Sequence, residues 1–404
     1  MALTRDKQEG QEFRRLKEGF YRVSVLKAQA HWLWKQREKE RNPTMTFYDN
    51  VLTAPEGLIR RGINDRQSLQ RRETEDFLRA LSEELPRRRE QLWQWDYSSV
   101  EAFLQSVEPN RQRWLAAVGD FGPPAAEMAP QREPFLEDEQ IIAEWVTIRL
   151  FDRLHGRAVL ARPKEHSEPL PLVLCQHGIS SSPERVFGFA DEEGYYHAYG
   201  RRLAAAGFAV LAPLNLTFGD PRARYHRMCL MLGKTLWGLE IAKLRRFLDY
   251  LQTRPEIDPQ RLGMWGISLG GAYTMFTLPL EPRLKVGIIT AWFNDRVRKM
   301  VIDDPRYSCF LSTKEEHIFI PGWLWEFDDS DLLSLICPRP VQIQTGKCDG
   351  IAWWPLVVEE FQRARAHYEK LGLADRLELD LHEGGHEIRF ESGLRFLRRW
   401  LGCG

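Results

Sequence analysis

The sequence lacks an excess of charge of either sign, closely spaced cysteines and any long apolar run. Lysine and arginine together number 57, and so do aspartate and glutamate, so the formal net charge is zero. This balance gives no general electrostatic reason to expect nucleic acid or an anionic membrane as a partner. The six cysteines are scattered singly, with neither a C-x-x-C pair nor zinc-ligand spacing. We therefore expect reduced thiols, no disulfides and no structural metal.

No apolar segment is long enough to cross a bilayer, and the first residues are charged where a secretion signal would be apolar. These absences predict a soluble, cytoplasmic protein. At 404 residues the chain is long enough for two domains, or for one large α/β domain with additions.

Residues 1–130 carry helical patterns and form the first predicted domain. Apolar residues recur at steps of three and four between residues 5 and 42, and again just before Pro86, which is expected to end a helix. A further helix is expected from Ser98, whose hydroxyl forms a candidate capping box with Glu101. This domain is a candidate lid, homo-oligomer interface or packing buttress, and the sequence does not choose among the three.

The second predicted domain covers residues 135–404 and follows a proline-rich connector at 122–134. It contains short apolar segments separated by intervals that can each hold a helix. This alternation predicts the α/β class, with a mainly parallel, doubly wound sheet covered by helices on both faces. The expected strands are 141–150 and 157–162, which suit an antiparallel pair, then 170–175, 208–213, 261–265, 286–290, 340–345 and 377–381. Function is expected at the carboxyl ends of the parallel strands.

The segment from Arg261 to Ala272 is typical of a buried strand that turns abruptly into a helix, with Ser268 at the corner. Gly266 and Gly270 flank this serine in a G-x-S-x-G pattern, which allows the backbone to pass close to its neighbours while the serine is strained and exposed. Such a pattern also occurs by chance, and a glycine-rich turn with a solvated serine is the alternative. Ser268 is the predicted nucleophile.

A serine hydroxyl needs a base near neutral pH, and the base needs an acid to orient it. Asp349 follows the strand at 340–345, and His386 follows the strand at 377–381, so adjacent strand ends can bring them together. An ordinary turn aspartate is the alternative for Asp349. His382 is a rival base, but it continues the alternation of its strand. The rival acids lie in an irregular insertion and are Asp303, Asp304, Asp328, Asp329 and Asp331.

Acyl transfer also requires hydrogen-bond donors for the oxyanion of the tetrahedral intermediate. One expected donor is the backbone N–H of Leu269, the residue after the nucleophile. The second is expected from the loop after an early strand, where Ile179 follows His177 and Gly178. We expect His177 to be a structural hydrogen-bonding residue and not a base.

With these pieces placed, the chain resembles the α/β-hydrolase superfamily, and within it the dienelactone-hydrolase-like and acetyl-xylan-esterase-like serine esterases. The resemblance covers roughly residues 135–404, and it is carried by the His177-Gly178 loop, segments 232–238, 249–251, 255–271 and 337–340, Asp349 and His386. It implies an α/β-hydrolase fold with Ser268 as nucleophile, Asp349 as acid and His386 as base. Ile179 and Ser180 depart from the pattern of many relatives, which bears on the size of the acyl pocket.

We predict a serine carboxylic ester hydrolase of the carboxylesterase or deacetylase type, which acts on a small-molecule ester through an acyl-enzyme. No metal or organic cofactor is expected. Two alternatives stay open: an amide or peptide hydrolase of the prolyl-oligopeptidase-like type, and a non-catalytic binding protein on a hydrolase fold. The presence of serine, aspartate and histidine at the expected places argues against the last.

The insertion between residues 293 and 335 is unusually aromatic and is expected to set substrate choice. Trp323 and Trp325 lie in it, while Trp353 and Trp354 follow the acid closely. These four side chains are candidates for an apolar wall that binds substrate, with ordinary core packing as the alternative. The first interpretation predicts that Trp323→Ala changes the acyl chain-length preference more than it changes thermal stability.

Overall fold

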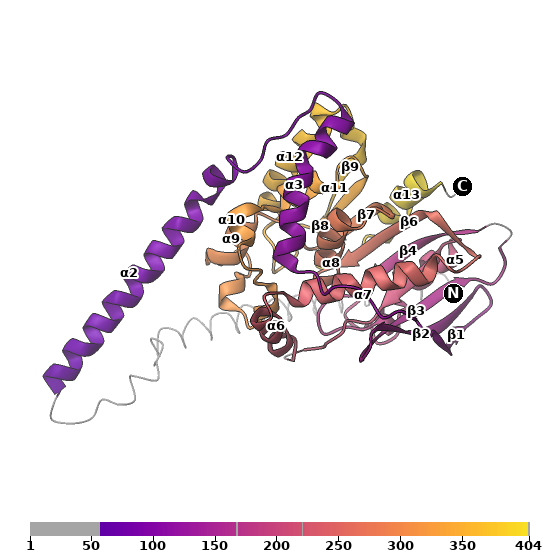
Figure 1. The fold of residues 1–404 in the computed structure, drawn as a ribbon, viewed down its shortest axis with the longest axis horizontal. Coiled ribbons are helices and arrows are strands. Elements are labelled where there is room, and N and C mark those ends of the chain that lie inside the picture. The colour runs from indigo at the N-terminus through magenta and orange to yellow at the C-terminus, as the bar shows by residue number, and fades with distance from the viewer. Residues whose placement is uncertain (1–56, 167–168, 220, 403–404) are drawn as a thin grey trace, which may run out of the picture. The chain divides into compact units, whose positions relative to one another are not determined.

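The computed structural model describes residues 57–166, 169–219 and 221–402, which belong to two compact units, Met1–Leu78 and Arg79–Gly404. The described part of the first unit lies in helix α2 (Gly57–Arg89), which continues into the second unit (Figure 1). The helical pattern expected between residues 5 and 42 lies outside the described residues. Within the described ranges, no helix combines the length and apolar character needed to span a membrane.

One nine-stranded sheet runs through the described part of the second unit, in the order β1-β2-β3-β5-β4-β6-β7-β8-β9. Its strands are β1 (Gln131–Glu137), β2 (Ile141–Phe151), β3 (Leu154–Pro163), β4 (Leu170–Gln176), β5 (Ala209–Pro213), β6 (Ile257–Ile267), β7 (Leu284–Thr290), β8 (Val341–Gly346) and β9 (Leu377–His382). The pairs from β1 to β5 are antiparallel, and the pairs from β5 through β4 to β9 are parallel. The predicted mainly parallel sheet and its eight expected strands are confirmed.

Strand β1 was missed, because its residues overlap the segment that composition marked as a connector. Pro134 lies within this strand, and most of its residues are exposed at the edge of the sheet. An edge strand buries little and tolerates proline, so it carries neither an apolar run nor strict alternation. Part of the predicted connector is therefore an edge strand.

Helices cover both faces of the sheet (Figure 1). The described helices other than α2 are α3 (Val100–Val118), α4 (Pro183–Val186), α5 (Tyr199–Ala205), α6 (Pro221–Met231), α7 (Leu236–Leu251), α8 (Leu269–Thr277), α9 (Arg296–Val301), α10 (Trp323–Glu326), α11 (Asp329–Ile336), α12 (Trp354–Lys370) and α13 (Phe390–Leu401), with 3-10 turns η2 (Leu278–Leu280), η3 (Phe310–Ser312), η4 (Glu316–Ile318) and η5 (Ala374–Arg376).

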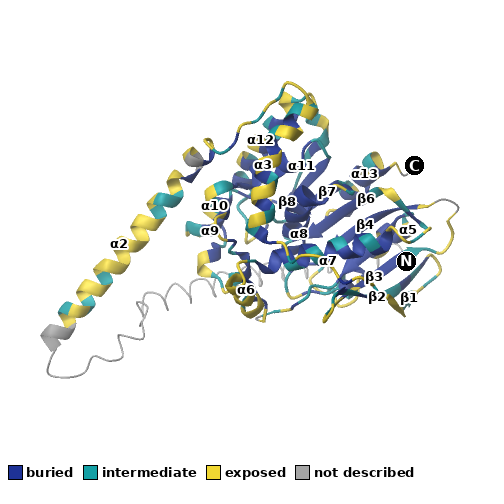
Figure 2. Ribbon diagram, viewed as in Figure 1, coloured by how far each residue is buried: buried dark blue, intermediate teal, exposed yellow. Residues whose placement is uncertain are grey.

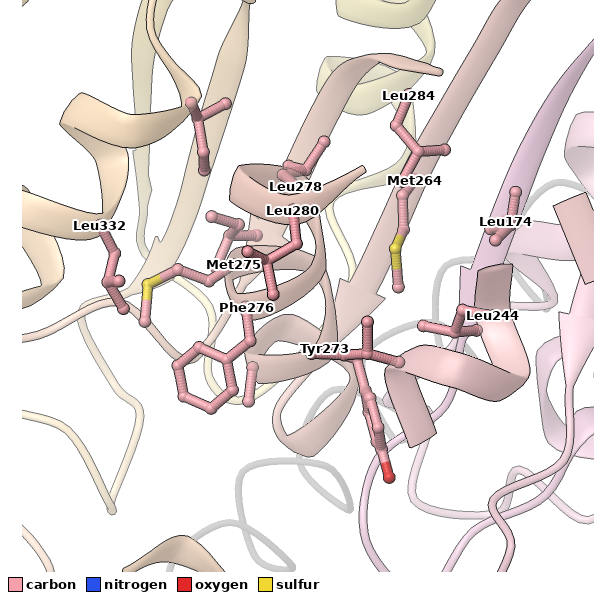
Figure 3. Close-up of a cluster of buried hydrophobic side chains, with 14 of the residues drawn as sticks. Leu174, Leu244, Met264, Tyr273, Met275, Phe276, Leu278, Leu280, Leu284 and Leu332 are labelled. Atoms are coloured by element: carbon pink, nitrogen blue, oxygen red, sulfur yellow. The ribbon is translucent and has the colours of Figure 1, made fainter. Parts of the chain in front are cut away.

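Two hydrophobic clusters lie on opposite faces of the sheet, and alternation along the strands produces both. In β4, Leu172 and Leu174 belong to one cluster, while Val173 and Cys175 belong to the other. Helices α3, α7, α8, α11 and α12 cover the first, and α4, α5 and α13 cover the second. Figure 2 shows the central strands buried between these layers, and Figure 3 shows part of the first cluster around α8.

Two helix boundaries differ from the sequence prediction. Helix α2 does not end at Pro86 but continues to Arg89. Helix α3 begins one residue later than expected, because the side chain of Ser99, and not that of Ser98, accepts a hydrogen bond from the Ala102 N–H at 3.0 Å.

Helix α3 packs within the second unit although its sequence lies in the predicted N-terminal domain. Trp114 is fully buried, and its indole N–H donates to the Phe276 carbonyl of α8 at 3.1 Å. Arg111 donates to the carbonyls of Pro279 and Leu335 at 2.6 and 2.9 Å. These contacts fix α3 against α8, the helix that follows Ser268. Helix α3 therefore supports α8 from outside.

Candidate active site

Ser268 lies at the corner where β6 ends and α8 begins, in a strained backbone conformation. Its φ and ψ are 59° and −122°, outside the regions that non-glycine residues normally adopt. A Cβ on Gly266 would lie 2.0 Å from the Gly270 carbonyl oxygen, and one on Gly270 would lie 2.1 Å from the Gln176 carbonyl oxygen. Both glycines are therefore sterically required. The Ser268 N–H donates to the Thr290 carbonyl of β7 at 2.9 Å, which holds the corner against the sheet.

The structure brings Asp349 and His386 together. The Nδ1 atom of His386 lies 2.8 Å from Oδ2 of Asp349, while Oδ1 of the same carboxylate accepts the Ile351 N–H at 3.0 Å. Asp349 is 5% exposed, whereas the His386 side chain is 21% exposed. A buried carboxylate with one oxygen fixed by the backbone can orient the imidazole through its other oxygen.

Backbone hydrogen bonds join the turn after β8 to the loop after β9. The Lys347 N–H donates to the His382 carbonyl at 2.8 Å, and the Cys348 N–H donates to the Gly384 carbonyl at 3.0 Å. These bonds extend the parallel pairing beyond the strand ends. Asp349 and His386 therefore meet because their loops continue the β8–β9 register, as the sequence prediction of adjacent strand ends requires.

A cavity of about 350 Å³ contains Ser268 and Asp349 in its wall, together with Leu269 and Ile179. His386 joins this group through its bond to Asp349. About half of the other lining residues are apolar, and the polar ones are Asn294, Lys299, Ser308, Thr313, Glu315, His317 and Thr345. The cavity thus combines apolar surface with polar groups that can orient a ligand, as small-molecule sites do.

The residues of both predicted oxyanion donors, Leu269 and Ile179, line the same cavity as Ser268. Leu269 is the first residue of α8, and the N–H groups in a first helical turn have no acceptor within the helix. The positive end of the helix dipole favours negative charge at this place. Ile179 lines the cavity from the loop after β4. In that loop Gly178 donates its N–H to the Tyr196 hydroxyl at 3.0 Å, which fixes the approach of the chain.

His177 is a buried, neutral, hydrogen-bonded residue, as expected for a structural histidine. Its Nε2 accepts the Asn215 N–H at 3.3 Å, so its Nδ1 carries the proton and donates to the Gly178 carbonyl at 2.9 Å. Burial is the main cause that lowers the pKa of His177 to about 3. The imidazole thus shapes the loop before Ile179.

The rival base and acids are engaged elsewhere. The Nδ1 atom of His382 accepts the Gly384 N–H at 3.1 Å, and burial lowers the pKa of this histidine. Each rival acid has its own partners: Asp303 binds Arg79 and Ser312, Asp304 binds Arg306, Asp328 binds Arg89 and Arg363, Asp329 binds Arg296, and Asp331 accepts the Asp328 N–H.

None of the four tryptophans predicted to bind substrate lines this cavity. Trp323 is 2% exposed and packs in the first hydrophobic cluster, so the alternative of core packing describes it. Trp325 is 46% exposed, and the Arg306 guanidinium stacks 3.6 Å from the ring centre of Trp353. Trp354 begins α12 and has the Lys347 ammonium 5.9 Å from its ring centre.

Other aromatic residues line the cavity instead, and the sequence held a signal for two of them. Trp292 and Phe293 directly follow the carboxyl end of β7, the position where function was expected, whereas Phe310 lies in the insertion. The insertion does contribute to the cavity, but with different residues from those predicted. Lys299 and Glu315 lacked a motif and were missed.

No protein-family model matches the sequence. Over 277 residues the chain is 28% identical to the Bacillus subtilis (strain 168) protein named "Putative hydrolase YtaP", which covers 66% of this chain and 90% of that protein. A solved structure from Bacteroides fragilis NCTC 9343, named a "putative acetyl xylan esterase", aligns with a TM-score of 0.59 at 16% identity, over 75% of this chain and 80% of that one. A glucuronoyl esterase from Teredinibacter turnerae gives 0.57 at 16% identity, over 75% and 86%. The chain has the α/β-hydrolase fold, as the sequence predicted.

Proposed function

We propose that the protein is a serine hydrolase that cleaves a carboxylic ester through a Ser268–His386–Asp349 triad. The observation that carries this proposal is the placement of a strained serine and a buried aspartate in the wall of one cavity, with that aspartate bonded to a histidine. The names of the similar proteins, a hydrolase and two esterases, support the same class of reaction.

In the proposed reaction the Ser268 hydroxyl oxygen attacks the ester carbonyl carbon, and His386 takes the serine proton at Nε2. Asp349 accepts a hydrogen bond from the Nδ1–H group of the imidazole and stabilises the imidazolium, without taking the proton itself. The N–H groups of Leu269 and Ile179 donate to the oxyanion of the tetrahedral intermediate. The intermediate expels the alcohol, which receives the proton from His386. Water, activated by the same imidazole, then attacks the acyl-enzyme and releases the acid.

The test is the hydrolysis of p-nitrophenyl esters from acetyl to octanoyl by the wild type and by Ser268→Ala. We expect the variant to lose at least about 10³-fold in kcat, and to lose labelling by a fluorophosphonate probe, while it keeps its circular dichroism spectrum. Ser312→Ala is the matched control, because Ser312 bonds Asp303 in the insertion. Equal turnover by the wild type and Ser268→Ala would contradict the proposal.

The same assay with matched p-nitroanilide substrates distinguishes ester cleavage from amide cleavage. Anilide turnover that equals ester turnover would move the function to the amide and peptide hydrolases. A folded wild type that turns over neither substrate and takes no label would indicate a binding role.

A further inference from the structure

Lys299 has its ammonium group buried in the wall of the cavity, on helix α9. The residue is 6% exposed. Its Nζ donates to the Ser308 carbonyl, the Ser308 hydroxyl and the Ile351 carbonyl, each at 2.6 Å. An ammonium has three N–H donors, so these bonds use all of them. Lys299 therefore has no N–H left for a substrate, and its bonds tie two separate segments of the chain together.

One of those segments is the turn that carries Asp349. Ile351, whose carbonyl Lys299 binds, donates its own N–H to Oδ1 of Asp349 at 3.0 Å, and Oδ2 of the same carboxylate lies 2.8 Å from His386. The Ser308 N–H also donates to the Ile351 carbonyl at 3.3 Å. A continuous series of bonds thus runs from the insertion to the imidazole, through Ile351 and the carboxylate.

The charge at this place is not explained by packing, because burial of an ammonium is costly. Desolvation, and after it the positive charge of Arg296, lowers the pKa of Lys299 to about 8. Asp349, Glu315 and Cys309 act in the opposite direction. The Phe310 ring, whose centre lies 4.9 Å from Nζ, is the aromatic neighbour. An apolar side chain would fill the space without this cost, but it would leave the Ile351 carbonyl without its charged donor.

We propose that Lys299 is a positioning residue of the hydrolytic site: it fixes the turn at Asp349–Ile351 against the insertion, and so holds the Asp349 carboxylate on His386. This inference rests on the proposed function. The insertion at 293–335 then has a second task besides forming part of the cavity wall, since it sets the orientation of the acid. Lys299 acts through the turn and does not touch the reacting atoms.

The test compares Lys299→Met with Lys347→Met in the full-length protein. Lys347 is the matched control, because it lies two residues before Asp349, its side chain is 34% exposed, and its Nζ bonds the exposed carboxylate of Glu383. For p-nitrophenyl acetate we expect Lys299→Met to lose about 100-fold in kcat with little change in KM, as misplacement of a catalytic group does. Lys347→Met should stay within about threefold of the wild type, the scatter expected for a change that leaves the geometry intact.

Chemical rescue separates positioning from a general loss of stability. Lys299→Ala opens space in the cavity wall, so added ethylammonium should restore part of its kcat in a saturable manner. It should have no effect on Lys347→Met. A lower melting temperature with an unchanged kcat per folded molecule, or a loss of kcat that no ammonium restores, would overturn the proposal.

A crystal structure of Lys299→Met gives a readout that does not depend on activity. We expect the turn at 349–351 to shift and the Asp349–His386 contact to lengthen or break. If the wild type shows no hydrolysis that depends on Ser268 while this contact breaks in the variant, the proposed function fails and the positioning role stands. An unchanged contact overturns the positioning role whatever the activity.

Discussion

Both carboxylate oxygens of Asp349 take part in hydrogen bonds, and these bonds predict the effect of substituting this residue. One oxygen accepts the Ile351 N–H, and the other lies against Nδ1 of His386. If the imidazole is the proposed base, its Nδ1 must carry the proton so that Nε2 is free to accept one from the serine. A carboxylate enforces that tautomer because it can only accept hydrogen bonds.

Asp349→Asn should therefore keep the fold and lose catalysis. An asparagine amide can donate to Nδ1 and select the wrong tautomer, and the loss of the negative charge removes the stabilisation of the imidazolium. We expect kcat for p-nitrophenyl acetate to fall about 10³- to 10⁴-fold with an unchanged melting temperature. Asp304→Asn, in an exposed pair with Arg306, is the control. A loss below tenfold would assign the acid role to another residue.

At the scale of elements, the sequence predicted what depends on local patterns. Buried parallel strands are continuous apolar runs, so β4 to β9 were found within a few residues. The corner at Ser268 was found from Gly266 and Gly270, and the structure shows why both are glycine: a Cβ at either position would lie about 2 Å from a backbone oxygen. Asp349 and His386 were found because parallel strand ends lie side by side.

What the sequence could not predict depends on contacts between distant segments. An exposed strand such as β1 has no apolar face to reveal it. A tryptophan is as apolar in a core as in a binding site, so residue type did not separate Trp323 from Trp292. Only the position of Trp292 just after β7 pointed to the cavity that it lines, whereas Trp323 is buried in the core. Lys299 has no motif because its partners lie 9 and 52 residues away in the chain.

The placement of these two tryptophans reverses the expected effects of substitution. Trp323→Ala should cost about 3–5 kcal/mol in the free energy of unfolding, because it leaves a cavity in the first cluster, and should change the acyl chain-length preference little. Trp292→Ala should shift that preference toward longer acyl chains, because Trp292 lines the cavity. Urea unfolding and the p-nitrophenyl ester series measure the two effects. If Trp323→Ala shifts the acyl chain-length preference and Trp292→Ala does not, Trp323 and not Trp292 contacts the acyl group.

At the scale of the whole molecule, several histidines are buried in the neutral form. Burial lowers the pKa values of His177, His317 and His367, to about 3, 2 and 4. In the unfolded chain a histidine titrates near pH 6.5. Below that value the unfolded state binds more protons than the folded state, so these groups reduce stability as the pH falls. Burial raises the pKa of Asp331 to about 7, and this group acts in the opposite sense, since stability is lost as the pH rises from 3.8 through 7.

His367 offers a test that isolates one of these groups, because it lies among aromatic rings on α12 and bonds the Tyr97 hydroxyl at 2.8 Å. His367→Phe keeps the ring packing and removes the titration. Relative to this variant, the wild type should lose stability as the pH falls from 6.5 toward 4, by at most about 3 kcal/mol. Urea unfolding of both proteins at pH 7.5 and 4.5 measures the difference, with His155→Gln on the exposed part of β3 as the control. If the free energy of unfolding changes equally with pH in the wild type and in His367→Phe, His367 is protonated in the folded protein. Helices α3 and α12 would then not exclude water from the imidazole.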